Sequence, residues 1–259
     1  MIRLVHFGSL CALVLFAVPA ISAEPAIPAT IDPKADGPTI YQTVCIQCHG
    51  PQGQGNEALK APSIAGRPAW YVIQQLGNFR EGRRGHNPQD VPGTLMTSIA
   101  RLLHPENLAK VADTVEKMPL VVPTAQTALK QPDLEEGRLL FSERCMECHR
   151  FNATGEMTFG SPPLIGLQDW YLLAQIEKFK SGWRGAHPKD VYGAKMVISA
   201  QFIESEQAKH DVVAFILSLN PAGDAKKEHD DLFKQGTTTA TKDKTLGLSA
   251  KGSGGARSE

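Results

Sequence analysis

The feature that most constrains this chain is an internal repeat with an offset of 100 residues. The string CIQCH at Cys45–His49 returns as CMECH at Cys145–His149, and much of the segment after each string is repeated as well. The identical pairs include Gly66 and Gly166, Trp70 and Trp170, Gln75 and Gln175, Arg84 and Arg184, and Met96 and Met196. The chain is therefore a tandem duplication, and a chemical role in one half should have a counterpart in the other.

Both strings have the form Cys-x-x-Cys-His, which is the attachment sequence of c-type haem. Two thiols add to the porphyrin vinyl groups as thioethers, and the adjacent histidine then lies under the iron as its proximal ligand. The sequence predicts two covalently attached haem c groups. We expect the thioethers at Cys45, Cys48, Cys145 and Cys148, and the proximal ligands at His49 and His149.

Other roles for these cysteines fit less well. A Cys-x-x-Cys pair can be redox-active, but such pairs sit in a strand-helix context, and no alternating strand pattern lies near either site. Four cysteines can share one zinc ion, yet a spacing of 100 residues is far from the tight spacing of zinc ribbons. Both alternatives leave the adjacent histidines unexplained.

The same register identifies candidates for the sixth iron ligand. None of the histidines between residue 24 and the end of the chain that lie outside the two strings has a histidine 100 residues before or after it. These histidines are His86, His104, His187, His210 and His229. Of the methionines available, Met96, Met118, Met146, Met157 and Met196, only Met96 and Met196 form a pair. Each lies 47 residues after its haem histidine, at the end of a loop that contains glycine. A lone methionine is usually core filler, but a pair in register with two haem sites is predicted to ligate iron.

The rival ligand pair is His86 with His187, which lie in the same loop but are out of register by one residue. The identical residues on either side fix the alignment, namely Gly85 and Gly185 before them and Pro88 and Pro188 after them. We interpret these two histidines as exposed loop residues.

Apolar periodicity predicts an all-α fold with three helices in each half. The first helix runs into each haem string, from about Thr39 and from about Leu134. The second covers 69–81 and 169–181, and the third follows Pro105 or Ser205 and ends near Pro119 or Pro221. The expected domains are 24–118 and 134–221, joined by a proline-rich, extended linker at 119–133.

The chain ends have compositions unlike those of the repeat. Arg3, an apolar run over 7–18 and small residues after it predict a signal peptide, residues 1–23, that is cleaved on export. Residues 222–259 are rich in Lys, Thr, Gly and Ser, and we expect a flexible polar tail. No later segment is apolar enough to predict a transmembrane span in the mature chain. With 27 basic and 27 acidic residues the net charge is zero, which argues against nucleic acid as a partner.

These motifs resemble those of small class I cytochromes c, and the tandem arrangement resembles the dihaem cytochrome c4 family over about Gly37 to Pro221. The resemblance implies two class I cytochrome c domains related by internal duplication. It also implies that the carbonyls of Pro62 and Pro162 accept the Nδ1 hydrogen of His49 and His149.

Several other repeated residues are candidates for contacts with haem. Arg84 and Arg184 suit the carboxylates of haem, because a planar guanidinium binds them well, but solvated arginines in a turn are equally expected. Trp70, Tyr71, Trp170 and Tyr171 are predicted to wall the haem pockets.

The function predicted from these features is a periplasmic dihaem electron carrier rather than an enzyme. Iron with six ligands has no open site for a substrate, and Met/His ligation favours a high potential. The expected donor is a quinol-oxidising complex or a dehydrogenase, and the expected acceptor is a terminal oxidase or reductase. Two alternatives stay open: a fixed cytochrome subunit of a larger dehydrogenase or oxidase, and a dihaem enzyme such as a peroxidase or thiosulfate dehydrogenase.

Overall fold

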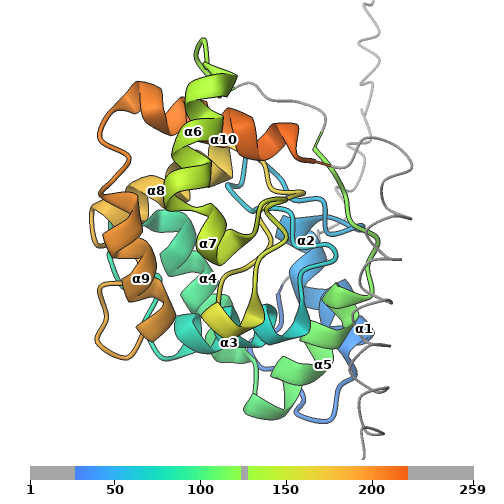
Figure 1. The fold of residues 1–259 in the computed structure, drawn as a ribbon. Helices are drawn as coiled ribbons and strands as arrows, with labels where there is room; N and C mark the ends of the chain where they lie inside the picture. The colour runs from blue at the N-terminus through green and yellow to red at the C-terminus, as the bar shows by residue number, and fades with distance from the viewer. Residues whose placement is uncertain (1–26, 124–127, 221–259) are drawn as a thin grey trace, which may run out of the picture.

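The computed structural model describes residues 27–123 and 128–220, which are helical in both halves and contain no assigned strand (Figure 1). The first half contains α1 (Gly37–Ile40), the π-helix η1 (Tyr41–Cys45), α2 (Ile46–His49), α3 (Ala69–Arg80), α4 (Val91–Leu102) and α5 (Pro105–Glu116). The second half contains α6 (Leu134–Arg144), α7 (Met146–His149), the 3₁₀-helix η2 (Met157–Phe159), α8 (Asp169–Lys180), α9 (Val191–Ala200) and α10 (Glu206–Ser218). Within these two ranges no helix is long and apolar enough to cross a bilayer. The all-α prediction is confirmed, while the predicted signal peptide and tail lie outside the described residues.

The helices predicted from periodicity form at the predicted places. In the first half they are the continuous helical stretch from α1 to α2, then α3 and α5, and in the second half α6 with α7, then α8 and α10. Their starts follow from the sequence: Asp36 accepts a hydrogen bond from the backbone N–H of Thr39 at 2.7 Å and caps α1. Pro105 begins α5, where a missing N–H costs nothing.

The prediction of a loop directly before each paired methionine is wrong, because the residues nearest to each methionine are helical. Met96 and Met196 each lie in the second turn of a helix, α4 or α9. Asp90 caps α4 by accepting from the N–H of Gly93 at 3.0 Å, and Asp190 caps α9 in the same way. The sequence Val-Pro-Gly is typical of a loop, but proline is tolerated in a first helical turn and the aspartate cap stabilises it.

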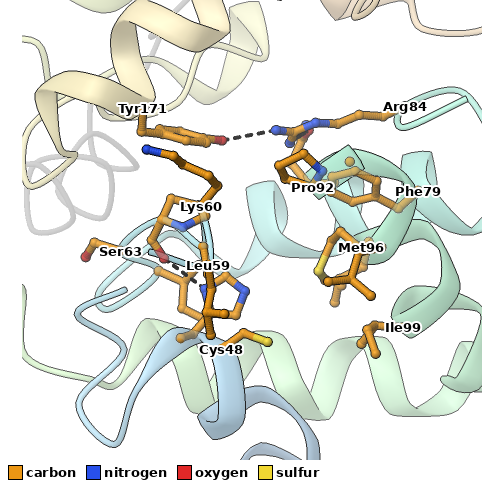
Figure 2. A pocket seen from close by; sticks show the side chains of 18 of the residues that line it. Cys48, Leu59, Lys60, Ser63, Phe79, Arg84, Pro92, Met96, Ile99 and Tyr171 are labelled. Atoms are coloured by element: carbon orange, nitrogen blue, oxygen red, sulfur yellow. Dashed lines mark hydrogen bonds between the residues drawn. The ribbon is translucent and has the colours of Figure 1, made fainter. Parts of the chain in front are cut away.

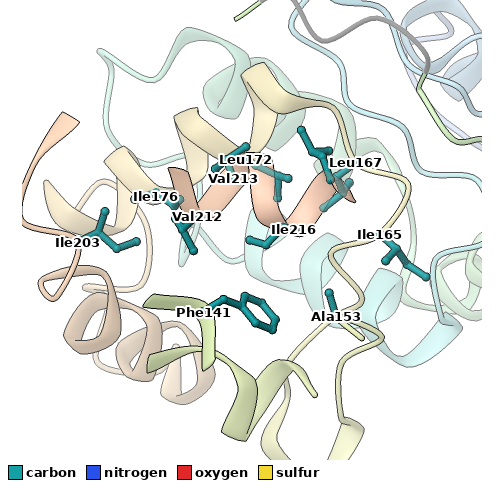
Figure 3. Packing of buried hydrophobic residues seen from close by; sticks show 11 residues of the cluster. Phe141, Ala153, Ile165, Leu167, Leu172, Ile176, Ile203, Val212, Val213 and Ile216 are labelled. Atoms are coloured by element: carbon teal, nitrogen blue, oxygen red, sulfur yellow. The ribbon is translucent and has the colours of Figure 1, made fainter. Parts of the chain in front are cut away.

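Each module has its own apolar core. The first gathers residues of η1, α3 and α5, including Tyr41, Val44, Leu76, Phe79, Val111 and Val115. In the second, Figure 3 shows Phe141 of α6 facing Ile216 of α10. Positions 41 and 141 are equivalent in the repeat, but the Tyr41 hydroxyl donates to the carbonyl of Gly50 at 2.6 Å, whereas Phe141 packs against Phe215.

The helix that leads into each haem string crosses the last helix of its module at a glycine. A β-carbon at Gly37 would lie 2.1 Å from the carbonyl oxygen of Lys110 in α5. One at Gly137 would lie 2.1 Å from the carbonyl oxygen of Asp211 in α10. Because the opposing atoms belong to the backbone, rotating a side chain cannot relieve the contact. Glycine is therefore required at both crossings.

The two modules contact one another directly. The Arg67 guanidinium donates to the carbonyls of Pro163 and Ile165 at 2.9 and 2.5 Å. In the opposite direction, the side-chain amide of Gln168 donates to the carbonyl of Gln54 at 2.8 Å. The two modules therefore lie side by side, while residues 124–127 of the linker lie outside the described residues.

Gly37→Ala and Gly137→Ala should each lower the free energy of unfolding by about 1–3 kcal/mol, because the added methyl group overpacks a backbone crossing. The matched control is Gly77→Ala in α3, where the nearest atom to a β-carbon is a side-chain nitrogen at 3.7 Å. That change should be neutral or gain up to about 1 kcal/mol from helix propensity. Denaturant unfolding of the full chain measures all three, and equal effects at Gly37 and Gly77 would contradict the close crossing.

Candidate functional site

The histidine of each Cys-x-x-Cys-His string is buried and held by a backbone carbonyl. Nδ1 of His49 lies 2.8 Å from the oxygen of Pro62, and Nδ1 of His149 lies 3.1 Å from that of Pro162, as the resemblance predicts. A carbonyl oxygen only accepts, so Nδ1 carries the hydrogen and Nε2 keeps its lone pair. Burial lowers the pKa of His149 to about 4 and also lowers the pKa of His49. Both rings are therefore neutral at pH 7 and can bind a metal through Nε2.

Each histidine faces a cavity that its own cysteines and the paired methionine also line. The first cavity has a volume of about 400 Å³ and is lined by Cys45, Cys48, His49 and Met96, among others. Figure 2 shows Met96, from α4, on the opposite side of this cavity from Cys48. The second cavity is smaller, about 130 Å³, and its lining includes Cys145, Cys148, His149 and Met196. The structure thus brings together the predicted site residues of each module.

The rejected ligand candidates lie elsewhere. Neither His86 nor His187 lines either of these two cavities. His86 is exposed as predicted, whereas His187 is partly buried, and its Nδ1 accepts a hydrogen bond from the backbone N–H of Lys189 at 3.1 Å. Met118 packs against the first core, while Met146 and Met157 are exposed. The methionine pair selected by sequence register is therefore also the pair that lines the cavities.

The cysteines are not arranged as reactive thiolates. Burial is the largest influence on Cys45 and Cys145, and together with the second cysteine of each string it raises the pKa of both thiols to about 12. Redox-active cysteines have a lowered pKa instead. The four cysteines also divide between two cavities, which argues against a shared zinc site.

The cavity linings fit haem by their chemistry. The first is walled largely by apolar side chains, including Val44, Leu76, Phe79 and Ile99, which suit a porphyrin ring. Two buried polar atoms of lining residues, Oγ of Ser63 and Nε of Arg67, have no hydrogen-bond partner among the described residues. Buried polar atoms are rarely left unpaired, so these two atoms are consistent with a ligand that carries polar groups. The second cavity offers the same two thiols, imidazole and thioether.

A buried polar layer forms the wall that the two cavities share. Arg84 and Arg184 face one another as an antiparallel bridge, and they are only 9% and 8% exposed, so the solvated alternative is wrong. Both cavities are lined by the same repeated residues of the two modules, namely Tyr71, Gln75, Tyr171 and Gln175. Residues 100 positions apart thus meet at one wall.

The predicted aromatic lining is confirmed in part. Tyr71 and Tyr171 line both cavities and Trp170 lines the first, whereas Trp70 lines neither of the two. Trp183 also lines the first cavity, which the repeat does not predict. Its position in the repeat is occupied by Arg83, so register carried no signal for it.

One ion pair crosses between the modules beside this layer. Nζ of Lys178 donates to the Asp90 carboxylate at 2.6 Å, and Asp90 is almost fully buried. At the equivalent place on the other side, the amide of Asn78 approaches Asp190 at 3.4 Å. The acceptor is repeated, but the donor is a cation on one side and a neutral amide on the other.

Comparison with known proteins gives matches in both modules. The Cytochrome c family model matches residues 34–118 and again 134–220. A thiosulfate dehydrogenase electron acceptor of Stutzerimonas stutzeri (strain A1501) is 32% identical over 176 residues, covering 61% of this chain and 77% of that protein. Cytochrome c4 of Azotobacter vinelandii is 31% identical over 105 residues, covering 37% of this chain and 48% of that protein. The solved structure of Acidithiobacillus ferrooxidans cytochrome c4 is 24% identical, with a TM-score of 0.54, and the match covers 67% of this chain and 97% of that one.

Lys178→Ala should lower the free energy of unfolding by about 3 kcal/mol, because it leaves the buried Asp90 carboxylate without its cation. Lys178→Asn copies the equivalent residue of the first module and supplies a neutral donor, so it should cost less. Denaturant unfolding at neutral pH measures both variants. Equal losses for the two would show that a neutral donor cannot replace the cation, and no loss in either would show that Asp90 needs no donor at this position.

Proposed function

The chain belongs to the cytochrome c family, and we propose that it is a periplasmic carrier of single electrons with one haem site in each module. It has two covalently attached haem c groups, as its two Cys-x-x-Cys-His strings and its dihaem relatives support. The proposed domains are 24–118 and 134–221 with the linker 119–133 between them. The proposed precursor also has the signal peptide 1–23 and the polar tail 222–259.

The proposed iron ligands are His49 with Met96 and His149 with Met196, and the proposed thioethers are at Cys45, Cys48, Cys145 and Cys148. The observation that carries this proposal is the presence, in each cavity, of a neutral carbonyl-bound histidine together with the methionine selected by register. Haem iron supplies one-electron redox chemistry. The Pro62 and Pro162 carbonyls orient the imidazoles, and Met96 and Met196 would bind the iron on haem loading and so exclude a substrate from it.

Access for redox partners is available at the mouth of each cavity. Leu59 and Leu95 line the first cavity and are exposed, and Phe159 and Tyr192 do the same for the second. Exposed apolar side chains grouped around an opening are typical of protein interaction sites. We propose that donor and acceptor proteins approach these two openings.

The proposed donor is a periplasmic dehydrogenase, and the proposed acceptor is a terminal oxidase or reductase. The match to a thiosulfate dehydrogenase electron acceptor supports a dehydrogenase over a quinol-oxidising complex. The same relative makes thiosulfate dehydrogenase the first donor to test.

Met96→Ala and Met196→Ala should each remove about half of the far-red charge-transfer band of sulfur-ligated ferric haem, because each removes one of two sulfur ligands. Absorption spectra of the oxidised protein measure the loss. His86→Ala and His187→Ala are the controls and should leave the band unchanged. A band that responds to the histidines instead of the methionines would overturn the ligand assignment.

The carrier function predicts full reduction of the protein by two electron equivalents, one for each haem. Thiosulfate alone should leave the oxidised protein unchanged, and thiosulfate with thiosulfate dehydrogenase should reduce it. The reduced wild type should scarcely bind carbon monoxide, because methionine occupies the sixth position. Stoichiometric carbon monoxide binding to one haem, with steady turnover of thiosulfate or peroxide by the chain alone, would show that it is an enzyme.

A further inference from the structure

The opening of the second cavity carries two exposed cations that lie against exposed aromatic rings. Arg144 and Lys195 both line this cavity, and both are exposed. The Arg144 guanidinium lies 4.5 Å from the centre of the Phe202 ring, and Nζ of Lys195 lies 5.4 Å from the centre of the Tyr192 ring. A ring attracts a cation through its quadrupole but carries no negative charge, so neither cation is neutralised. The opening is therefore both apolar and positively charged.

No carboxylate of the described residues balances these two charges. Among residues 27–123 and 128–220 neither cation takes part in an ion pair. Asp190 is the one carboxylate among the described residues that line this cavity, and it is buried as the cap of α9. Glu143 and Glu147 are exposed close to Arg144 in the sequence, but they line neither cavity. The opening thus attracts a partner that carries negative charge.

The opening of the first cavity differs in charge. The two equivalent positions are occupied by Val44 and Leu95, which are apolar. Lys60 is the one exposed cation among the described residues that line the first cavity, and it faces the carboxylate of Glu57 at 3.7 Å. Both openings expose apolar side chains, but unpaired positive charge is found at the second. The two openings are therefore suited to different partners.

Helix α9 extends the apolar part of the second opening along the surface. Val191, Lys195 and Ile198 are all exposed, and their spacings of four and three residues place them on one face of the helix. The cation therefore lies between two exposed aliphatic side chains. Apolar and aromatic residues together with arginine are typical of the centres of protein–protein interfaces.

We propose that the second opening is the docking surface for a redox protein that presents carboxylates around an apolar centre. The residues that define this docking surface are Arg144, Tyr192, Lys195, Ile198 and Phe202. The inference rests on the proposed function, because the docked protein exchanges its electron with the second haem. One electron passes between the two, so that one is oxidised as the other is reduced, and no bond forms or breaks.

The chemistry of the docking surface favours a protein over a lipid surface. The planar guanidinium of Arg144 binds a carboxylate through two parallel hydrogen bonds. The two cations also stand at the opening of a cavity that holds the residues of a redox site, and a lipid headgroup exchanges no electrons. A partner that reaches this opening must itself carry a redox centre.

The test uses the haem-loaded full chain and a flavin-labelled synthetic peptide of glutamate and leucine. A light flash reduces the flavin, which then reduces the oxidised haem, and transient absorption gives the second-order rate constant. A peptide with glutamine in place of glutamate is the neutral counterpart. The acidic peptide should react faster than the neutral one at low ionic strength, and salt should remove the difference because it screens exposed charges.

The double variant Arg144→Gln with Lys195→Gln should lower the rate constant of the acidic peptide by about tenfold at low ionic strength and leave that of the neutral peptide unchanged. Arg138→Gln and Lys117→Gln are the matched controls. Both are exposed cations that line neither cavity, and each is paired with a carboxylate. Ile198→Ser should slow both peptides at every ionic strength, because it removes apolar contact. Haem content and midpoint potentials of every variant show whether the second redox site is intact.

Equal rate constants of the two peptides with the wild type would overturn the proposal. So would a double variant that reacts as fast as the two controls. If the double variant loses haem, the salt dependence of the wild type and Ile198→Ser decide the question.

Two other occupants would also overturn it. Vesicles of phosphatidylglycerol that bind the wild type but not the double variant, with no preference between the peptides, would assign the surface to lipid. A dimer in sedimentation velocity that the double variant loses would assign it to a second copy of this chain. Failure of the proposed function gives a different result, because the wild type would then take up fewer than two electrons in a reductive titration, whatever the peptides do.

Discussion

Two guanidinium groups buried between the modules are the interaction on which the arrangement of the whole molecule depends. Each has hydrogen-bond acceptors from both modules, because within residues 27–123 and 128–220 its own module supplies one glutamine oxygen. Satisfying Arg84 brings Tyr171 and Gln175 to the interface, and satisfying Arg184 brings their counterparts there. Those same side chains line both cavities. The contacts that join the modules therefore also bring the two haem sites to a common wall.

The sequence was sufficient for the parts of the structure that depend on local pattern or on register. Apolar periodicity located the helices on either side of each cavity, and the offset of 100 residues singled out Met96 and Met196. It did not locate α4 and α9, because Pro92 and Gly93 have low helix propensity and the stabilising contribution comes from the Asp90 cap. A single aspartate before such a run is also compatible with a turn.

The contacts between the modules could not be predicted from the repeat. Arg67 and Gln168 cross the interface in opposite directions, but their equivalents, Leu167 and Pro68, cannot make the same bonds. The alignment of the repeat identifies the residues that are identical in the two modules. At positions 67 and 168 the modules have different residues, so the alignment gives no information about these contacts. Likewise, the repeat gives no sign that Gln75 bonds to an arginine of each module, because that depends on how the two helical units pack.

The reciprocal arginine contacts have the geometry of a twofold-symmetric dimer, in which residue i of one copy contacts residue j of the other and vice versa. In a true homodimer every such contact occurs twice with the same residue types. Covalent fusion lifts that restriction, and Lys178 with Asp90 on one side against Asn78 with Asp190 on the other is a direct result. A dimer of identical subunits could not place one extra cation on a single side of its axis. Joining the two units in one chain thus allows the two redox sites to differ in energy, so that the transferred electron can have a preferred direction.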